Sequence, residues 1–189
     1  MDSWSVSQVV FVAAVVVVTA VALYTDLRWA RIPNALTLPF FALGWIYRVW
    51  AYWDALGPGL IDALQGFALG FGTYFVLWIV AGSGGGDVKL MGALSVWLGF
   101  KLTLWVIVVS TVLVAIDLMF VTLYRIARFG VGSLRRQDSS DRNADAKEHR
   151  GGAAADQRRR LRFAVPLAMA TWLVLLADAT LLRGGVLAP

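Results

Sequence analysis

Six long apolar runs constrain what this chain can fold into more than any other feature of its sequence. An α-helix needs about 20 consecutive apolar residues to cross the roughly 30 Å of hydrocarbon in a bilayer. Polar or glycine-rich stretches separate the runs, which cover residues 4–25, 35–53, 60–81, 88–100, 102–124 and 163–182. In lipid, backbone polar groups must be hydrogen-bonded within the segment, so each run is predicted to be helical. The sequence therefore predicts an all-α, polytopic membrane protein, a bundle of about six transmembrane helices.

The fourth run is short, and only Gly99-Phe100-Lys101 divides it from the fifth. The two runs together are far too long for a single crossing. We therefore expect a sharp break at this point, with the fourth helix tilted or sunk in the bundle. In the third run, Gly66 and Gly70 form a small-residue pair that predicts close packing against another helix.

The placement of Lys and Arg predicts the orientation in the membrane. If the N-terminus is outside, the inner connections hold fourteen of the 17 basic residues, and the outer side holds Arg48, Lys101 and Arg183. Basic residues concentrate on the cytoplasmic side of membrane proteins, which favours this orientation. The leading segment, MDSWSVSQ, has an acid and no base, so we expect a retained helix rather than a signal peptide.

Residues 130–160 form an extended polar stretch that is rich in charge, alanine and glycine and has no apolar periodicity. We expect a disordered cytoplasmic loop that contacts membrane lipid, within a single transmembrane domain spanning residues 1–189. No aromatic residues alternate with the basic ones in this stretch, so nucleic acid is not an expected partner.

Composition excludes several kinds of catalytic site. The chain is 59% hydrophobic, against about 45–50% in ordinary soluble domains, and it has no Cys and one His, His149. Disulfides, thiolate zinc sites, a Cys nucleophile and a histidine metal cluster are therefore excluded. We predict neither a metal site nor a cofactor, so any chemistry would fall to acidic residues.

Two acids fall at the predicted cytoplasmic ends of separate helices, because Asp26 ends the first helix and Asp87 opens the fourth. Two carboxylates held close together in a site of low dielectric share one proton. One can then act as a general base on water while the protonated one polarises a carbonyl. Simpler alternatives stay open, in which Asp87 is a helix N-cap and Asp26 pairs with Arg28 or Arg31.

The segments around these acids are compact. GSGGGDVK, residues 82–89, fits neither a Walker A loop nor a dinucleotide-binding GxGxxG motif. Its glycines leave room for a second backbone to approach beside Asp87. In DLRWARIPN, residues 26–34, Pro33 favours an extended Ile32, and Asn34 is placed to cap the next helix.

These two segments together resemble the two motifs of the type IV prepilin peptidase family, the GxGD-type intramembrane aspartic peptidases. The resemblance implies an endopeptidase that removes the leader peptide of prepilins or pseudopilins at the cytoplasmic face of the bacterial inner membrane, without a cofactor. It implies that Asp26 and Asp87 are catalytic. The supporting motif residues would be Arg31, Pro33, Asn34, Gly84, Gly86 and Lys89.

Longer family members carry an N-terminal cysteine-containing insertion that is linked to N-methylation of the trimmed pilin. The present sequence shows neither that insertion nor any Cys, so we expect no methyltransferase activity. The short form resembles the dedicated peptidases of tight-adherence (Tad/Flp-type) pilus systems.

Two other functions stay open on the sequence. Asp117 lies well within the fifth run, where we expect a buried hydrogen bond or ion pair, but it could be the relay of a small transporter or channel. Alternatively, the chain could be a non-catalytic secretion-system subunit in which Asp26 and Asp87 are only helix caps. Asp62 and Asp178 lie near outer helix ends, where we expect structural or solvated roles.

Overall fold

The computed structural model of this chain describes residues 5–29, 32–81, 85–129 and 164–180, and nearly all of them are helical. This confirms the predicted all-α class. The predicted loop at 130–160 lies outside the described residues. In chain order the elements are α1 (Val6–Trp29), α2 (Asn34–Ala51), the 3₁₀ turn η1 (Trp53–Ala55), α3 (Leu56–Ala81), α4 (Gly85–Phe129) and α6 (Ala164–Thr180).

Three helical stretches are long and apolar enough to cross a membrane. They cover Val6–Trp29, Trp53–Val80 and Gly85–Arg128, and a shorter apolar helix covers Val165–Ala179. The structure thus agrees with a membrane protein, whereas the number of six spans stays a prediction.

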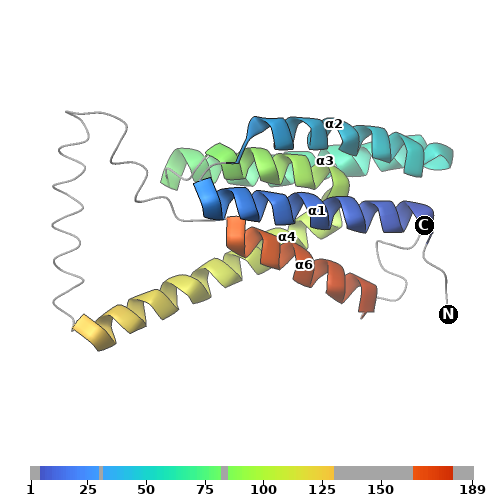
Figure 1. Cartoon of the computed structure of the whole chain (residues 1–189). Coiled ribbons are helices and arrows are strands. Elements are labelled where there is room, and N and C mark those ends of the chain that lie inside the picture. The colour runs from blue at the N-terminus through green and yellow to red at the C-terminus, as the bar shows by residue number, and fades with distance from the viewer. Residues whose placement is uncertain (1–4, 30–31, 82–84, 130–163, 181–189) are drawn as a thin grey trace, which may run out of the picture. The chain divides into compact units, whose positions relative to one another are not determined.

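The chain forms two compact units, one made of Met1–Thr111 with Leu161–Pro189 and the other of Val112–Arg160. Within the first unit, α1 contacts α2 and α6, and α2 contacts α3. Its helices alternate in direction, so α1 and α3 end, and α2, α4 and α6 begin, at the same end (Figure 1). We call this the aspartate end, since Asp26 and Asp87 lie there, and the opposite end, with Arg48 and Gly99, the arginine end.

The predicted break between the fourth and fifth runs is confirmed at Gly99. This residue has φ 72° and ψ −175° inside α4, a conformation that favours glycine. It divides α4 into a first arm, residues 85–98, and a second arm, residues 100–129. A Cβ on Gly70 of α3 would meet both Ser95 and Thr103, so the chain reverses direction at Gly99. At about 1.5 Å per residue the first arm rises only about 21 Å, which is short of a full crossing.

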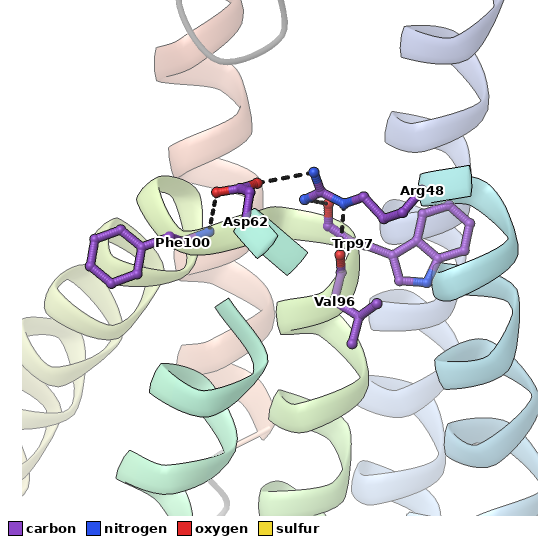
Figure 2. A network of polar contacts seen from close by, with 5 residues as sticks. All are labelled: Arg48, Asp62, Val96, Trp97 and Phe100. Carbon is purple, nitrogen blue, oxygen red and sulfur yellow. Dashed lines mark hydrogen bonds and ion pairs between the residues drawn. The ribbon is translucent and has the colours of Figure 1, made fainter. Parts of the chain in front are cut away.

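An ion pair between buried Arg48 and the partly exposed Asp62 binds the backbone groups that lose their helical partners at this break (Figure 2). Arg48, on the last turn of α2, donates from Nε to the Val96 carbonyl at 2.9 Å and from Nη2 to the Trp97 carbonyl at 2.8 Å. Its Nη1 lies 3.0 Å from Oδ2 of Asp62 on α3. The other oxygen of Asp62 accepts the Phe100 N–H at 3.0 Å.

The physical reason for this arrangement is that helix ends leave backbone groups without partners, and lipid cannot supply them. Arg48 places positive charge at the carbonyl end of the first arm, and Asp62 places negative charge at the N–H end of the second arm. Both signs match the helix dipoles. We refer to Arg48 and Asp62 as the clasp. Of the structural or solvated role expected for Asp62, the structure thus shows structural contacts on a side chain that is still 40% exposed.

Small residues on α3 allow the first arm to pack closely, as predicted from Gly66 and Gly70. A Cβ on Gly66 would lie 2.6 Å from the carbonyl carbon of Gly99. Trp97 holds the first arm to α2, because its Nε1 donates to the Phe40 carbonyl at 2.9 Å and its ring stacks between those of Phe40 and Tyr47. Residues 90–99 are all buried, so the first arm forms the centre of this unit.

Candidate active site

Asp26 lies one turn before the end of α1 and is 9% exposed. It continues the buried stripe of this helix, which follows helical spacing through Phe11, Val15, Thr19, Ala22 and Asp26. The next three residues, 27–29, are all exposed. The helical period therefore turns the Asp26 carboxylate into the bundle and leaves Arg28, one of its predicted partners, outside.

Asp87 lies in the first turn of α4 and is 7% exposed. The helix begins at Gly85, so Asp87 lies inside the helix as its third residue and not at the N-cap position that the simpler alternative gave it. Its charge is still favoured by the helix dipole at that point. Lys89, two residues further along, is exposed.

The structure brings the two motifs into contact. The side-chain nitrogen of Lys89 donates to Oδ1 of Asn34 at 3.0 Å. A Cβ on Gly86 would lie 3.4 Å from Cβ of Ile32, so the chain after Asp26 packs directly against the glycine before Asp87. Two segments that are more than fifty residues apart in sequence thus form one local structure at the aspartate end.

The side chain of Asn34 makes a different hydrogen bond from the one predicted. We expected its side chain to cap α2, but the N-cap residue is Pro33, and no side-chain cap hydrogen bond is present there. Asn34 is the first residue of α2 and its side chain accepts from Lys89. Pro33 itself has an extended conformation, with φ −70° and ψ 138°. Of the other motif residues, Arg31 and Gly84 lie outside the described residues.

A cavity of about 230 Å³ adjoins the contact between the motifs. Asn34 and Lys89 provide its most polar groups, and it extends along α2, α3 and the first arm of α4 over a mainly apolar lining. The remaining lining residues are Thr37, Leu38, Phe41, Phe67, Phe71, Gly92 and Ala93.

Tyr74 is a residue at this end that the motif search missed. It lies on α3, is 8% exposed, and its hydroxyl is 3.3 Å from Oγ of Ser110 on the second arm of α4. The signal that could have found it is the small face of α3, because Tyr74 follows Gly66 and Gly70 at helical spacing.

Two acids outside the motifs differ from expectation. Asp117 belongs to the second unit and is exposed, so the expected burial of its carboxylate is wrong. Its neighbours in the second arm, residues 115–120, are exposed as well. Asp178, in the last turn of α6, is 4% exposed, so a solvated role is excluded for it.

Residues 13–131 match the model of the type IV leader peptidase family. The chain belongs to this family. The match covers both motif segments and confirms the resemblance drawn from Asp26 to Asn34 and from Gly84 to Lys89. Membership does not favour the transporter, channel or secretion-subunit alternatives.

Curated relatives carry the name prepilin leader peptidase/N-methyltransferase. The chain is 29% identical over 93 residues to that of Burkholderia pseudomallei (strain 1026b), covering 46% of this chain and 29% of the relative. It is 30% identical over 96 residues to that of Aeromonas salmonicida (strain A449), covering 49% and 33%. It is 34% identical over 98 residues to that of Xanthomonas campestris pv. campestris, covering 48% and 33%. The match therefore spans about a third of each relative. No solved structure matches the chain.

Proposed function

We propose that this chain is a membrane-embedded aspartic endopeptidase that removes the leader peptide of prepilins or pseudopilins. Asp26 and Asp87 are its catalytic pair. The observation that carries the proposal is the contact between the two motifs, in which Lys89 binds Asn34 and Ile32 packs on Gly86. It places two buried carboxylates on adjoining segments at one end of the bundle. Family membership and the names of the relatives support the same reaction.

The chemistry follows from the shared charge of the pair. Two buried acids on adjoining segments do not both ionise readily, so together they retain one proton. The ionised carboxylate removes a proton from water, and the water oxygen attacks the scissile carbonyl carbon. The protonated carboxyl group donates to the carbonyl oxygen and stabilises the tetrahedral intermediate. Collapse of the intermediate breaks the C–N bond, and a proton passes to the leaving amine.

The surroundings of the pair suit a peptide substrate. Gly85 and Gly86 carry no side chains beside Asp87, so an extended backbone can approach the carboxylate closely. The apolar cavity that begins at Asn34 and Lys89 would take an apolar segment of the same substrate.

We further propose that the protein lies in the bacterial inner membrane with six spans and its N-terminus outside. The active site then faces the cytoplasm. Support comes from the positive-inside distribution of the basic residues. Arg48 was counted among the outer basic residues, but its 3% exposure shows that it is a clasp residue inside the bundle. Without Arg48, the basic residues counted on the outer side are Lys101 and Arg183. The excess of basic residues on the inner side is therefore larger than the count from the sequence.

The test is cleavage of co-expressed prepilins, followed by the mass of the processed product. Asp26→Asn and Asp87→Asn are each expected to abolish processing at unchanged protein level in the membrane. The matched control is Asp54→Asn, which changes an exposed acid in η1 and is expected to process normally. Processing by either variant, or failure of the unchanged protein to cleave any prepilin with a basic leader, would contradict the proposal.

A further inference from the structure

The face of α3 that packs on α4 ends in a buried tyrosine. Two small residues of this face lie close to α4, one at the break and one at the first arm. A Cβ on Gly66 would meet Gly99, and one on Gly70 would meet Ser95, while a Cβ on Gly85 would lie 3.9 Å from the Trp78 ring. Tyr74 lies between Gly70 and Trp78, so it faces the part of the first arm that leads to Asp87.

The hydroxyl of Tyr74 has a defined direction in this structure. Ser110 Oγ donates its one proton to the Ile107 carbonyl at 3.0 Å. The 3.3 Å contact between the two hydroxyl groups must therefore be donated by Tyr74 to Ser110. At this length the bond is weak, and its loss would cost little compared with a bond to an ionised carboxylate.

The two acids of the proposed pair lie at opposite poles of their helices. Asp87 is in the first turn of α4, where the helix dipole stabilises negative charge. Asp26 is in the last turn of α1, where the dipole disfavours negative charge. The helix ends therefore favour ionisation of Asp87 and retention of the shared proton on Asp26.

We propose that Tyr74 is a positioning residue that turns its phenolic O–H from Ser110 to the ionised carboxylate of Asp87. Asp87 is thereby the general base that activates water, and Asp26 is the protonated partner that donates to the scissile carbonyl. This inference rests on the proposed peptidase function. It assigns the two roles within the pair and adds a third residue that belongs to neither motif.

The other ionisable groups near the pair are few. In the described part of the first unit, Tyr24 and Arg28 on α1 are exposed, and Lys89 is held by Asn34. The other ionisable residues of the remaining described elements lie toward the arginine end: Tyr47, Arg48, Tyr52, Asp54, Asp62, Lys101 and Asp178. Tyr74 is a buried donor on the face of α3 that packs against the first arm, so its loss should act on Asp87.

The experiment measures the pH dependence of kcat and KM for the purified full chain on a prepilin that the unchanged protein cleaves. Tyr74→Phe keeps the ring and removes one hydroxyl. We expect kcat to fall about tenfold with KM within about twofold. We also expect the acidic limb of the profile to move to higher pH by about half a unit, because ionised Asp87 loses a donor.

Two further variants separate this role from a structural one. Ser110→Ala removes only the resting partner of the phenol, so kcat should be retained and the acidic limb should stay in place or move to lower pH. Tyr47→Phe, which loses a 3.1 Å bond to the Ser7 carbonyl at the arginine end, should leave the profile unchanged.

The inference is overturned if the Tyr74→Phe profile overlays that of the unchanged protein, or if its acidic limb moves to lower pH. It is also overturned if Ser110→Ala causes the same loss as Tyr74→Phe, since the bond between the two hydroxyl groups would then be the important feature. These outcomes leave the proposed function intact as long as Asp26→Asn and Asp87→Asn are inactive. Cleavage by either aspartate variant would instead overturn the proposed function itself.

Discussion

The two ends of the first unit bury charge in opposite ways. At the arginine end, a positive and a negative side chain bind each other and the open backbone at Gly99. At the aspartate end, two side chains of the same sign are buried on adjoining segments. Opposite charges that close a broken helix serve the fold, whereas like charges oppose it and need another reason to be kept. The comparison teaches that the sign and the partners of a buried group, more than its burial, indicate its role.

The largest expected effect comes from replacing one acid at each end and comparing the two variants. Asp87→Asn should lower cleavage by at least about 10³-fold, since the base is lost, while thermal stability in detergent stays equal or rises. Asp62→Asn should retain cleavage and lower stability, because the Arg48 charge loses its counter-ion. Prepilin processing and thermal unfolding, measured on the same preparations, check both. A joint loss of stability and activity in Asp87→Asn would show that the acid at this end is structural too.

The next effect concerns the cation of the clasp. Arg48→Ala should destabilise the protein by about 2–4 kcal/mol, mainly because buried hydrogen bonds of the guanidinium are lost, since the Asp62 carboxylate left behind is 40% exposed and can bind water. Two backbone carbonyls also lose their donor. Arg48→Lys should recover only part of this, because one ammonium group cannot reach all the acceptors of the planar guanidinium. Unfolding curves in detergent measure the difference. If Arg48→Ala were as stable as the unchanged protein, the charges at the arginine end would not serve the fold, and the contrast with the aspartate end would be lost.

Packing between the ends gives a smaller effect. Gly70→Ala should destabilise the protein by about 1–3 kcal/mol, because its Cβ would overlap the Ser95 side chain. Gly72→Ala is the matched control, since a Cβ there meets no atom within 4 Å. Unfolding midpoints of the two variants should therefore differ, and equal midpoints would argue against the close contact of α3 with the first arm.

The smallest effect tests the bridge between the motifs. Lys89→Gln replaces an exposed charged donor with a neutral one that can still reach Asn34. Prepilin cleavage is expected to fall only a few-fold, with no measurable change in the unfolding midpoint, since exposed polar contacts contribute little. Complete loss of cleavage would mean that Lys89 takes part in the chemistry instead of holding the two motifs together.

Local patterns predicted much of this protein correctly. The apolar runs became helices, Gly99 broke α4, and Gly66 and Gly70 packed closely, because each depends on the chemistry of a few neighbouring residues. Predictions about individual polar side chains were less successful. Asn34 binds Lys89 instead of capping α2, and Asp117 is exposed, because such outcomes depend on which helix face meets a neighbour.

The sequence by itself determined the helices, the break at Gly99 and the two acid-bearing motifs. Only the tertiary structure decided that Asn34 meets Lys89, that Arg48 closes the break, and that Tyr74 faces the arm that leads to Asp87. The physical reason is that helix formation is set by residues within a few turns, whereas these contacts depend on the rotation and register of whole helices. Those are settled by the packing of many side chains at once.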